Sequence, residues 1–467
     1  MGPGTFKLLF LGLMASGLPV AIAMAGASLV YVLVTGDIPS MVVIHRMVNG
    51  LDSFPLLAVP FFILAGNLMN SAGITNRIYN FALALVGWMR GGLGHVNIVG
   101  SVIFAGMSGT AIADAAGLGT IEIKAMKDHG YSTEFSVGVT AASATLGPII
   151  PPSLPFVIYA LFANVSVGAL FLAGILPGAV MAILMMLTVA FYARRNKWGS
   201  DVPFRWPRVI KALVELLVVA GWPTAIWAAT ELGAEPRLTV LLGLVVILAA
   251  DRAFRFSAVL PIMTPVLLIG GMTTGLFTAT EGAIAACVWA LLLGLVWYRT
   301  LSWKMLVKAS MDTIETTAAV LFIVAAASIF GWMLTATRTT EMIAAWVLSV
   351  TQSPAGFLLL ANLLMLFVGC FLEPTAAITI LVPILLPISN QLGIDPVHFG
   401  VVMVLNLMIG VLHPPMGMVL FVLARIANLS IERTTMAILP WLVPLLLSLG
   451  IITYWPATVL WLPKIMQ

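Results

Sequence analysis

The chain has 467 residues, of which 61% are hydrophobic and 9% are charged, and its formal net charge is +4. Soluble proteins carry about 25% charged residues, so this composition excludes a water-facing surface over much of the chain. The basic excess does not indicate a nucleic-acid partner, because basic residues in membrane proteins mark the cytoplasmic loops. The two cysteines, Cys287 and Cys370, lie in apolar runs and are expected to be core residues. They are too few for a metal cluster, and we expect no transition metal.

Apolar runs of membrane-spanning length recur along the whole chain, and we find no large soluble domain between them. The first run, at residues 16–33, is expected to form part of the first spanning helix. Later examples lie at 170–193, 318–334 and 436–454. We therefore predict an all-α polytopic membrane protein.

The next feature is an apolar segment that small and polar residues interrupt from Ala105 to Asp114. Its two arms, at 95–104 and 115–126, hold about 10–12 residues each, too few to cross a bilayer of about 30 Å at about 1.5 Å per residue. Two short arms around a Gly-rich tip favour a re-entrant helical hairpin at about residues 94–129.

A long helix with a Gly and Pro-Pro break follows this hairpin. Helix is expected at 135–146, a break from Gly147 to Pro155, and helix again at 156–163. Proline removes an amide donor and clashes with the preceding turn, so adjacent prolines after a glycine are expected to unwind the helix. The alternative is a simple kink. We predict a broken helix at about 131–166, within a first repeat at 1–198.

Residues 199–256 are predicted to connect two halves of the chain. The connection begins in a basic region expected in the cytoplasm, with Arg194, Arg195, Lys197, Arg205, Arg208 and Lys211. Apolar stretches at 212–230 and 238–250 are separated by a short polar segment. They are expected to form an additional out-and-back helical hairpin.

Residues 257–467 repeat the pattern of the first half. Pro151-Pro152 matches Pro414-Pro415 at an offset of 263 residues, and three glycines have partners at the same offset. These pairs are Gly106 and Gly369, Gly130 and Gly393, and Gly147 and Gly410. We predict two inverted repeats, the second with a hairpin at about 355–392 and a broken helix at about 395–430.

Paired, interrupted apolar segments in two halves are typical of the binding site of a secondary transporter. Freed backbone carbonyls and nearby hydroxyls suit sodium, and helix N-termini suit an anionic group. The candidates for one sodium site are Ser108, Gly109, Thr110, Gly147 and Pro148. The candidates for the other are Gly369, Thr375, Gly410 and Pro414. The alternative for the small residues is close helix packing.

Ionisable residues inside apolar segments are further functional candidates. Asp114 and Glu373 lie at the two tips, and His413 precedes Pro414. The alternative for both acids is capping of the return arm, and for His413 a hydrogen bond to a freed carbonyl. Glu281 is expected only to cap the helix that follows it. No zinc spacing, nucleophile elbow or phosphate loop occurs, so we expect no catalytic residues and no enzyme.

Several of these motifs together resemble the large membrane (M) subunit of tripartite ATP-independent periplasmic (TRAP) transporters. The resemblance covers nearly the whole chain. It rests on 108–114, Gly130-Tyr131, 147–153, 277–281, 393–396 and 413–415. Departures from the family pattern are Lys124 and Ala279, where many members have proline, and the long apolar pair in the connection.

The resemblance implies an elevator-type transporter of the bacterial inner membrane. Such a protein is sodium-coupled, receives an organic anion from a periplasmic binding protein, and works with a separate four-helix membrane subunit. One sodium site would lie at each tip and break, with the substrate between them. The candidate substrate contacts are Ser108, Asp114, Pro151, Ser153, Glu373 and His413.

We therefore predict sodium-coupled uptake of a small carboxylate. The alternative is a binding-protein-independent sodium/carboxylate symporter with the same architecture. C4-dicarboxylates, sialic acid, keto acids and sugar acids all remain open as substrates. A channel is disfavoured because two closed hairpin tips interrupt any continuous pore.

Overall fold

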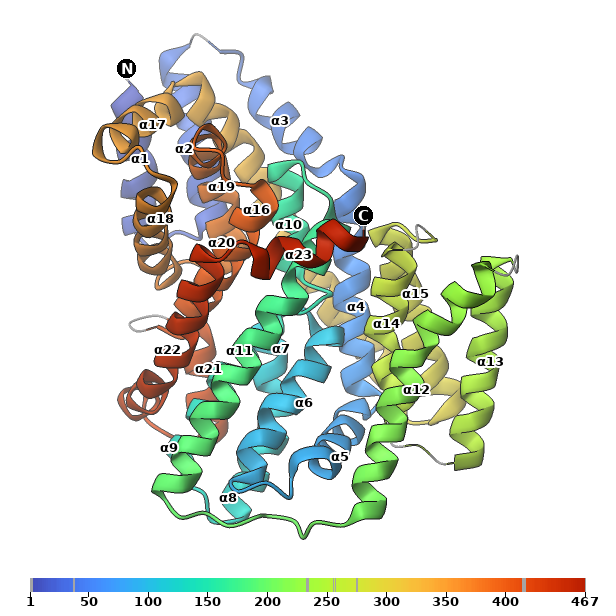
Figure 1. Ribbon diagram of the computed structural model, residues 1–467. Helices are drawn as coiled ribbons and strands as arrows, with labels where there is room; N and C mark the ends of the chain where they lie inside the picture. Colours follow the sequence, from blue (N-terminus) through green and yellow to red (C-terminus); the bar gives the residue numbers. More distant parts are fainter. Residues whose placement is uncertain are drawn as a thin grey trace.

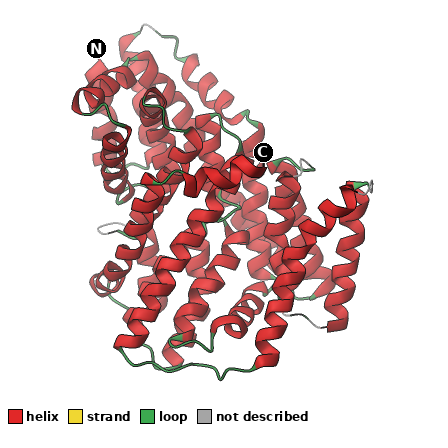
Figure 2. Cartoon of the chain, viewed as in Figure 1, coloured by secondary structure: helices red, strands yellow, loops and turns green. Residues whose placement is uncertain are grey.

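The computed structural model describes residues 3–36, 38–231, 235–254, 256, 258–273, 276–413 and 417–466. In these ranges the chain is built of helices and connecting loops (Figures 1 and 2), apart from an isolated bridge between Arg90 and Ser200. Six of the described helical segments are long and apolar enough to cross a membrane: Phe54–Ser71, Val167–Arg195, Ala279–Trp297, Trp303–Ala336, Pro374–Gln391 and Ile431–Tyr454. The chain is therefore a multi-pass membrane protein.

The N-terminal segment forms two helices, and the second of them covers most of the run at 16–33 that we expected to be part of the first spanning helix. Helix α1 covers Pro3–Ala15 and α2 covers Val20–Thr35. The chain turns between them because Gly17 adopts a φ of +86° and Pro19 cannot continue the preceding helix. Then follow α3 (Met41–Leu51), η1 (Phe54–Leu57), α4 (Ala58–Ser71) and α5 (Ile74–Val86). The long α16 (Trp303–Ala336) packs against α2, α3 and α4.

The first repeat contains a hairpin and then a broken helix. The hairpin consists of α6 (Gly92–Ser108), α7 (Ala111–Ala116) and α8 (Leu118–Asp128). Its first arm has 17 residues, more than we expected, because the helix continues to the tip through small residues that sequence reasoning assigned to the interruption. The broken helix consists of α9 (Thr133–Ala144) and α10 (Leu154–Ala163), and α11 (Val167–Arg195) follows.

The second repeat has the same order of elements, preceded by α17 (Thr339–Val350). They are α18 (Pro354–Gly369), α19 (Pro374–Gln391), α20 (Pro396–Gly410), α21 (Met418–Ala427) and α22 (Ile431–Tyr454), with α23 (Ala457–Met466) at the end. Helices α10 and α21 both have ten residues and end at left-handed asparagines, Asn164 and Asn428. Ser166 and Ser430 then cap α11 and α22. These matched ends confirm the internal repeat.

The connection forms α12 (Trp206–Glu231) and α13 (Pro236–Phe254), which stand together at one edge of the molecule in Figure 1. They contain the apolar stretches 212–230 and 238–250. Helix α14 (Val259–Thr273), α15 (Ala279–Leu291) and the π-helical η2 (Leu292–Trp297) lead on to α16. Thr278 and Glu281 form a capping box at the start of α15, which confirms the capping role expected for Glu281.

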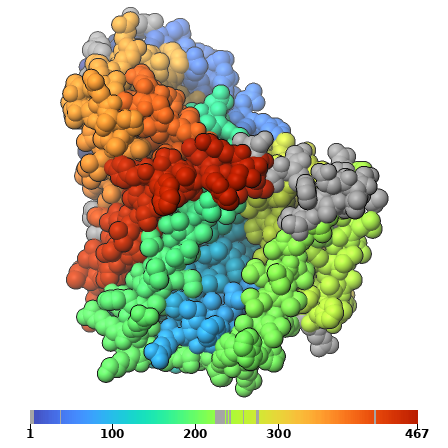
Figure 3. All heavy atoms as spheres, viewed as in Figure 1, coloured from blue at the N-terminus to red at the C-terminus, as the bar shows by residue number. Residues whose placement is uncertain are grey.

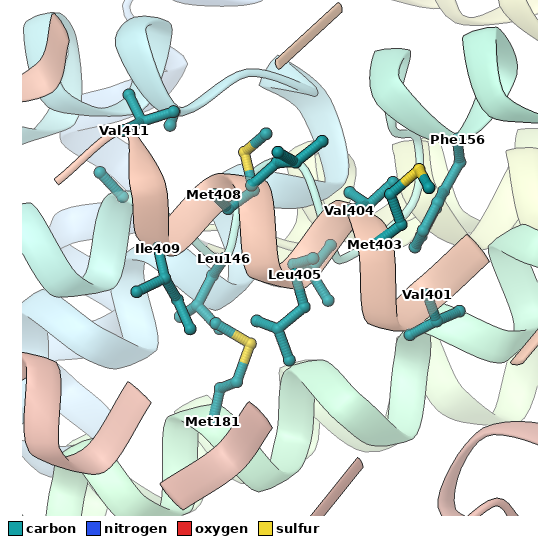
Figure 4. Close-up of a cluster of buried hydrophobic side chains, with 14 of the residues drawn as sticks. Leu146, Phe156, Met181, Val401, Met403, Val404, Leu405, Met408, Ile409 and Val411 are labelled. Carbon is teal, nitrogen blue, oxygen red and sulfur yellow. The ribbon is translucent and has the colours of Figure 1, made fainter. Parts of the chain in front are cut away.

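Helix α20 lies at the centre of the apolar core. Every residue from His398 to Gly410 is buried, and the helix packs against α10, α11, α18, α19 and α22. Figure 4 shows its Val401, Leu405 and Met408 among side chains from other elements, including Leu146, Phe156 and Met181. On the outside, the C-terminal segment crosses one face of the molecule beside α11 (Figure 3).

The segment 198–201, which follows α11 and is called the strap here, is hydrogen-bonded to the base of the first hairpin. Gly91 N donates to Gly199 O at 3.0 Å, and Asp201 Oδ2 accepts from Leu93 N at 2.9 Å and from the Tyr131 hydroxyl at 2.6 Å. The Tyr131 ring also packs on Trp198, with 4.6 Å between ring centroids. The strap thus joins α11, the start of α6 and the turn between α8 and α9.

We expect Asp201→Ala to destabilise the protein without changing its ion dependence. The substitution leaves the Leu93 amide and the Tyr131 hydroxyl without their acceptor, at a cost of about 1–3 kcal/mol. Thermal unfolding of the purified protein in detergent measures this loss. An unchanged unfolding temperature would show that the strap does not hold the hairpin base.

Candidate functional site

The tip of the first hairpin is a tight backbone turn. Helix α6 ends at Ser108, Gly109 has a φ of +64°, and Thr110 caps α7 by accepting from Ala113 N at 3.3 Å. A Cβ added to Gly109 would lie 3.0 Å from the Pro152 carbonyl oxygen. The tip therefore packs directly on the break between α9 and α10, and a glycine is required at the contact.

Gly147 lies in this break and faces the tip from the other side. A Cβ at Gly147 would lie 2.6 Å from Asp114 Oδ2 and 3.2 Å from the Thr110 carbonyl oxygen. The structure thus places the predicted residues Thr110 and Gly147 against each other. It adds Asp114, which we had predicted only as a substrate contact, to the same cluster.

Asp114 is 2% exposed and is only partly hydrogen-bonded. Its Oδ1 accepts from the Ser108 hydroxyl, whereas Oδ2 has no hydrogen-bond partner. The capping alternative for Asp114 is wrong, because Thr110 caps α7. A buried carboxylate oxygen without a donor is strongly disfavoured, so this oxygen has an unused capacity to bind a cation.

In the rest of the first break, the Ser153 side chain forms hydrogen bonds with backbone groups of the break and of α10. The Ser153 hydroxyl donates to the Pro148 carbonyl oxygen and accepts from Phe156 N at 3.2 Å, so Ser153 caps α10. Ser153 and Pro151 are both buried. Their role as substrate contacts stays a prediction.

The second tip and the second break meet through a close backbone contact. A Cβ at Gly410 would lie 2.7 Å from Gly369 Cα and 3.0 Å from the Gly369 carbonyl oxygen. The structure therefore brings these two predicted sodium ligands together. Pro414, the remaining candidate in this break, lies outside the described residues.

The polar residues of the second tip have local partners. Glu373 caps α19, because its Oε2 accepts from Ala376 N at 3.1 Å and its Oε1 accepts from the Thr375 hydroxyl at 2.8 Å. This confirms the capping alternative for Glu373. His413 Nδ1 lies 3.3 Å from the Cys370 thiol. The direct roles of Glu373, Thr375 and His413 in ion or substrate binding stay predictions.

Both repeats contribute to one small pocket between the tips. Its lining residues are Thr110, Ala111, Ile112, Pro148, Leu154, Pro155, Glu373, Pro374, Thr375, Met408, Val411 and Met418. Ala111, Leu154, Pro374 and Met418 are the first residues of α7, α10, α19 and α21. Four helices thus begin at this pocket, and helix N-termini attract anions.

The pocket has a volume of about 50 Å³. Sites for small organic ligands usually enclose about 300–1,000 Å³, so this conformation has room for an ion or water but not for an organic acid. Of the predicted residues that the structure describes, four line the pocket: Thr110, Pro148, Glu373 and Thr375. An organic substrate would require the two tips to separate.

Sequence reasoning missed one buried charged residue close to this region, Glu122. Sequence reasoning did not single it out, and two lysines, Lys124 and Lys127, follow it closely. Its spacing carried the missing information, since Leu118, Glu122 and Met126 fall on one face of α8, and all three are buried. We return to this residue below.

Two hairpins and two broken helices that meet at one pocket define a membrane transporter rather than an enzyme. Residues 8–458 match the family described as tripartite ATP-independent periplasmic transporter, DctM component, and the chain belongs to this family. It is 40% identical to the sialic acid TRAP transporter large permease protein SiaM of Vibrio cholerae, over 98% of this chain and 97% of that protein.

One further relative supports the family, and one solved structure shares the fold. The C4-dicarboxylate TRAP transporter large permease protein DctM of Pseudomonas aeruginosa is 36% identical, over 88% of this chain and 87% of that protein. Among solved structures, the YdaH transporter of Alcanivorax borkumensis superposes with a TM-score of 0.60 over 88% of this chain and 87% of that chain. Its sequence is 15% identical, so this likeness concerns the fold alone.

Proposed function

We propose that this protein is the sodium-coupled permease subunit for uptake of a carboxylate-bearing solute across the bacterial inner membrane. The observation that carries the proposal is the pocket at which helices from both repeats begin, with a broken helix beside each hairpin tip. Helix N-termini supply the attraction for a carboxylate. The adjacent breaks supply oxygen ligands for cations.

The donor atoms at the first tip support sodium as the coupling ion. They comprise the Thr110 carbonyl, the Ser108 hydroxyl and the Asp114 carboxylate, all within the cluster around Gly147. Oxygen ligands of this kind suit hard cations. Among the described residues no group of three or more His, Cys, Asp or Glu side chains could hold a metal ion.

An elevator movement is proposed for the opening that the pocket requires. The hairpins and broken helices would move together against α4 and α16. The contact of α4 with the first tip supports this, because a Cβ at Gly66 would lie 3.1 Å from the Met107 carbonyl oxygen. Small residues allow helices to approach closely and slide without interlocking side chains.

The partners and substrate are proposed from the relatives. The family description is of a tripartite periplasmic transporter, so we propose a periplasmic binding protein and a small membrane subunit as the other two parts. The two relatives described above are named for sialic acid and C4-dicarboxylates. Both substrates carry carboxylates, and we propose that the substrate of this protein does so too. A symporter that needs no binding protein is the second candidate.

Uptake into proteoliposomes tests the proposal. The protein would be reconstituted with the small subunit, and radiolabelled sialic acid or a C4-dicarboxylate supplied outside with its binding protein. We expect uptake only when an inward sodium gradient and the binding protein are both present. Uptake with sodium but without the binding protein would support the second candidate. Uptake that ignores the sodium gradient would overturn the ion assignment.

A further inference from the structure

A buried polar network joins the two arms of the first hairpin to α9. Glu122 Oε2 accepts from the Asn97 amide at 2.7 Å, and this amide lies 2.8 Å from Thr140 Oγ1. The Ser143 hydroxyl donates to Asn97 Oδ1 at 2.6 Å. Glu122 is 1% exposed, and the other three side chains are also buried. The network shares no residue with either predicted sodium site.

The second carboxyl oxygen of Glu122 lacks a partner. Oε1 makes no hydrogen bond and faces Gly100, where an added Cβ would lie 3.0 Å from Oε1 and 3.3 Å from a Leu118 methyl group. Hard cations in proteins are held by about six oxygen ligands. A glycine backbone and a leucine methyl group do not supply them, whereas a proton needs no such cage.

The charges around Glu122 do not neutralise a carboxylate. The charged group that acts on it is Asp114, which has the same sign. The other titratable side chains on the elements packed against α8 are His95 on α6, Tyr79 and Arg77 on α5, and Glu134 at the exposed start of α9. Arg77 is placed over the Tyr298 ring, 3.8 Å from its centroid. A buried, unpaired carboxylate is strongly disfavoured.

The second repeat shows that this fold does not require the acid. There the Asn406 amide donates to Asn362 Oδ1 at 2.7 Å, and the Asn362 amide donates to Thr453 Oγ1 at 3.1 Å. The offset of 263 residues places Leu385, which is buried, at the position of Glu122. The same architecture is thus built once with a neutral network and once with an added carboxyl group.

We propose that Glu122 is a proton-binding site of this transporter, separate from the sodium sites. The neutral acid keeps its hydrogen bond from Asn97 and packs Oε1 against Gly100. Loss of the proton creates a buried charge that repels Asp114 and loosens the hairpin from α9. Alkaline pH is therefore expected to weaken the first hairpin specifically.

Infrared difference spectroscopy on the purified protein tests this site directly, with no need for transport. Glu122→Gln keeps the size and the acceptor for Asn97, and it mimics the protonated acid. We expect the parent-minus-variant spectrum to show loss of a carboxylic-acid C=O band. Glu134→Gln is the matched control, because that glutamate is exposed and its spectrum is expected to lose a carboxylate band instead. Loss of a carboxylate band in Glu122→Gln would overturn the proposal, above all if sodium shifts that band.

A second measurement covers the case in which Glu122→Gln does not fold. The double variant Asn97→Leu with Glu122→Leu copies Leu360 and Leu385, which stand at the matching positions of the second repeat. Unfolding temperatures of parent and variants are compared from neutral to alkaline pH. We expect the parent to lose stability as pH rises and the variants without the acid to lose less. Equal losses in all proteins would overturn the proposal.

Discussion

We expect Gly410→Ala to abolish the proposed sodium-driven uptake and to lower the unfolding temperature. The new Cβ would lie 2.7 Å from Gly369 Cα and 2.8 Å from its carbonyl carbon. These are backbone atoms, so no side-chain rotation relieves the clash. Overpacking of this kind costs about 1–3 kcal/mol or more. Relief requires the second tip to move away from the break, which separates the groups proposed to bind the second sodium ion.

The measurement is uptake in proteoliposomes beside thermal unfolding of the same preparation. Gly450→Ala is the control, because Gly450 lies in α22 and nothing stands within 4 Å of its added Cβ. Alanine in a helix is favoured over glycine by about 0.5–1 kcal/mol, so this control is expected to keep full uptake. Parental uptake by Gly410→Ala would show that the tip and the break need not touch.

Asp114→Asn has the second large effect, which we expect on sodium rather than on stability. The substitution keeps the size of the side chain and its contact with Ser108 but removes the negative charge beside Gly147. A charged ligand strengthens such a contact by about 1.5–3 kcal/mol. The sodium concentration for half-maximal uptake is therefore expected to rise roughly tenfold or more.

Sodium titration of uptake at fixed substrate checks this expectation. Thr120→Ala is the matched control, since Thr120 lies on the exposed face of α8 and donates only to the Ala116 carbonyl. An Asp114→Asn protein with the parental sodium requirement would remove Asp114 from the first ion site. It would leave Ser108, Gly109, Thr110, Gly147 and Pro148 as the remaining candidates.

The repeat made most of the fold predictable. Gly and Pro-Pro landmarks at one offset located both hairpins and both broken helices, because two adjacent prolines after a glycine favour an interruption of the helix. The lengths of the arms were less predictable. Small residues before Ser108 looked like part of an irregular tip, yet α6 continues through them because glycine and alanine are tolerated in a packed membrane helix.

The candidate site was predictable in its backbone and less so in its side chains. Gly147 and Gly410 could be predicted because each break must approach a hairpin tip closely. Glycines at matching positions of the two repeats can indicate such an approach. Asp114 and Glu373 looked equivalent in the sequence, each an acid near a tip. The structure separates them, because Glu373 caps α19 whereas Thr110 performs that task for α7 and leaves Asp114 Oδ2 without a donor. Which side chain caps a helix depends on where each residue lies relative to the helix start, and the sequence alone does not show this position.

The pocket at which four helices begin has a consequence for how its selectivity can be altered. The anion attraction that we propose for it comes from peptide groups, which side-chain substitutions leave in place. Apolar lining residues such as Ile112, Met408 and Met418 can therefore be exchanged to reshape the site while its preference for negative charge persists. Alanine scanning would then measure how side-chain shape affects substrate selectivity, but it would not measure the electrostatic contribution of the peptide groups. Replacing single backbone amides by esters at the starts of α10, α19 and α21 would measure that contribution.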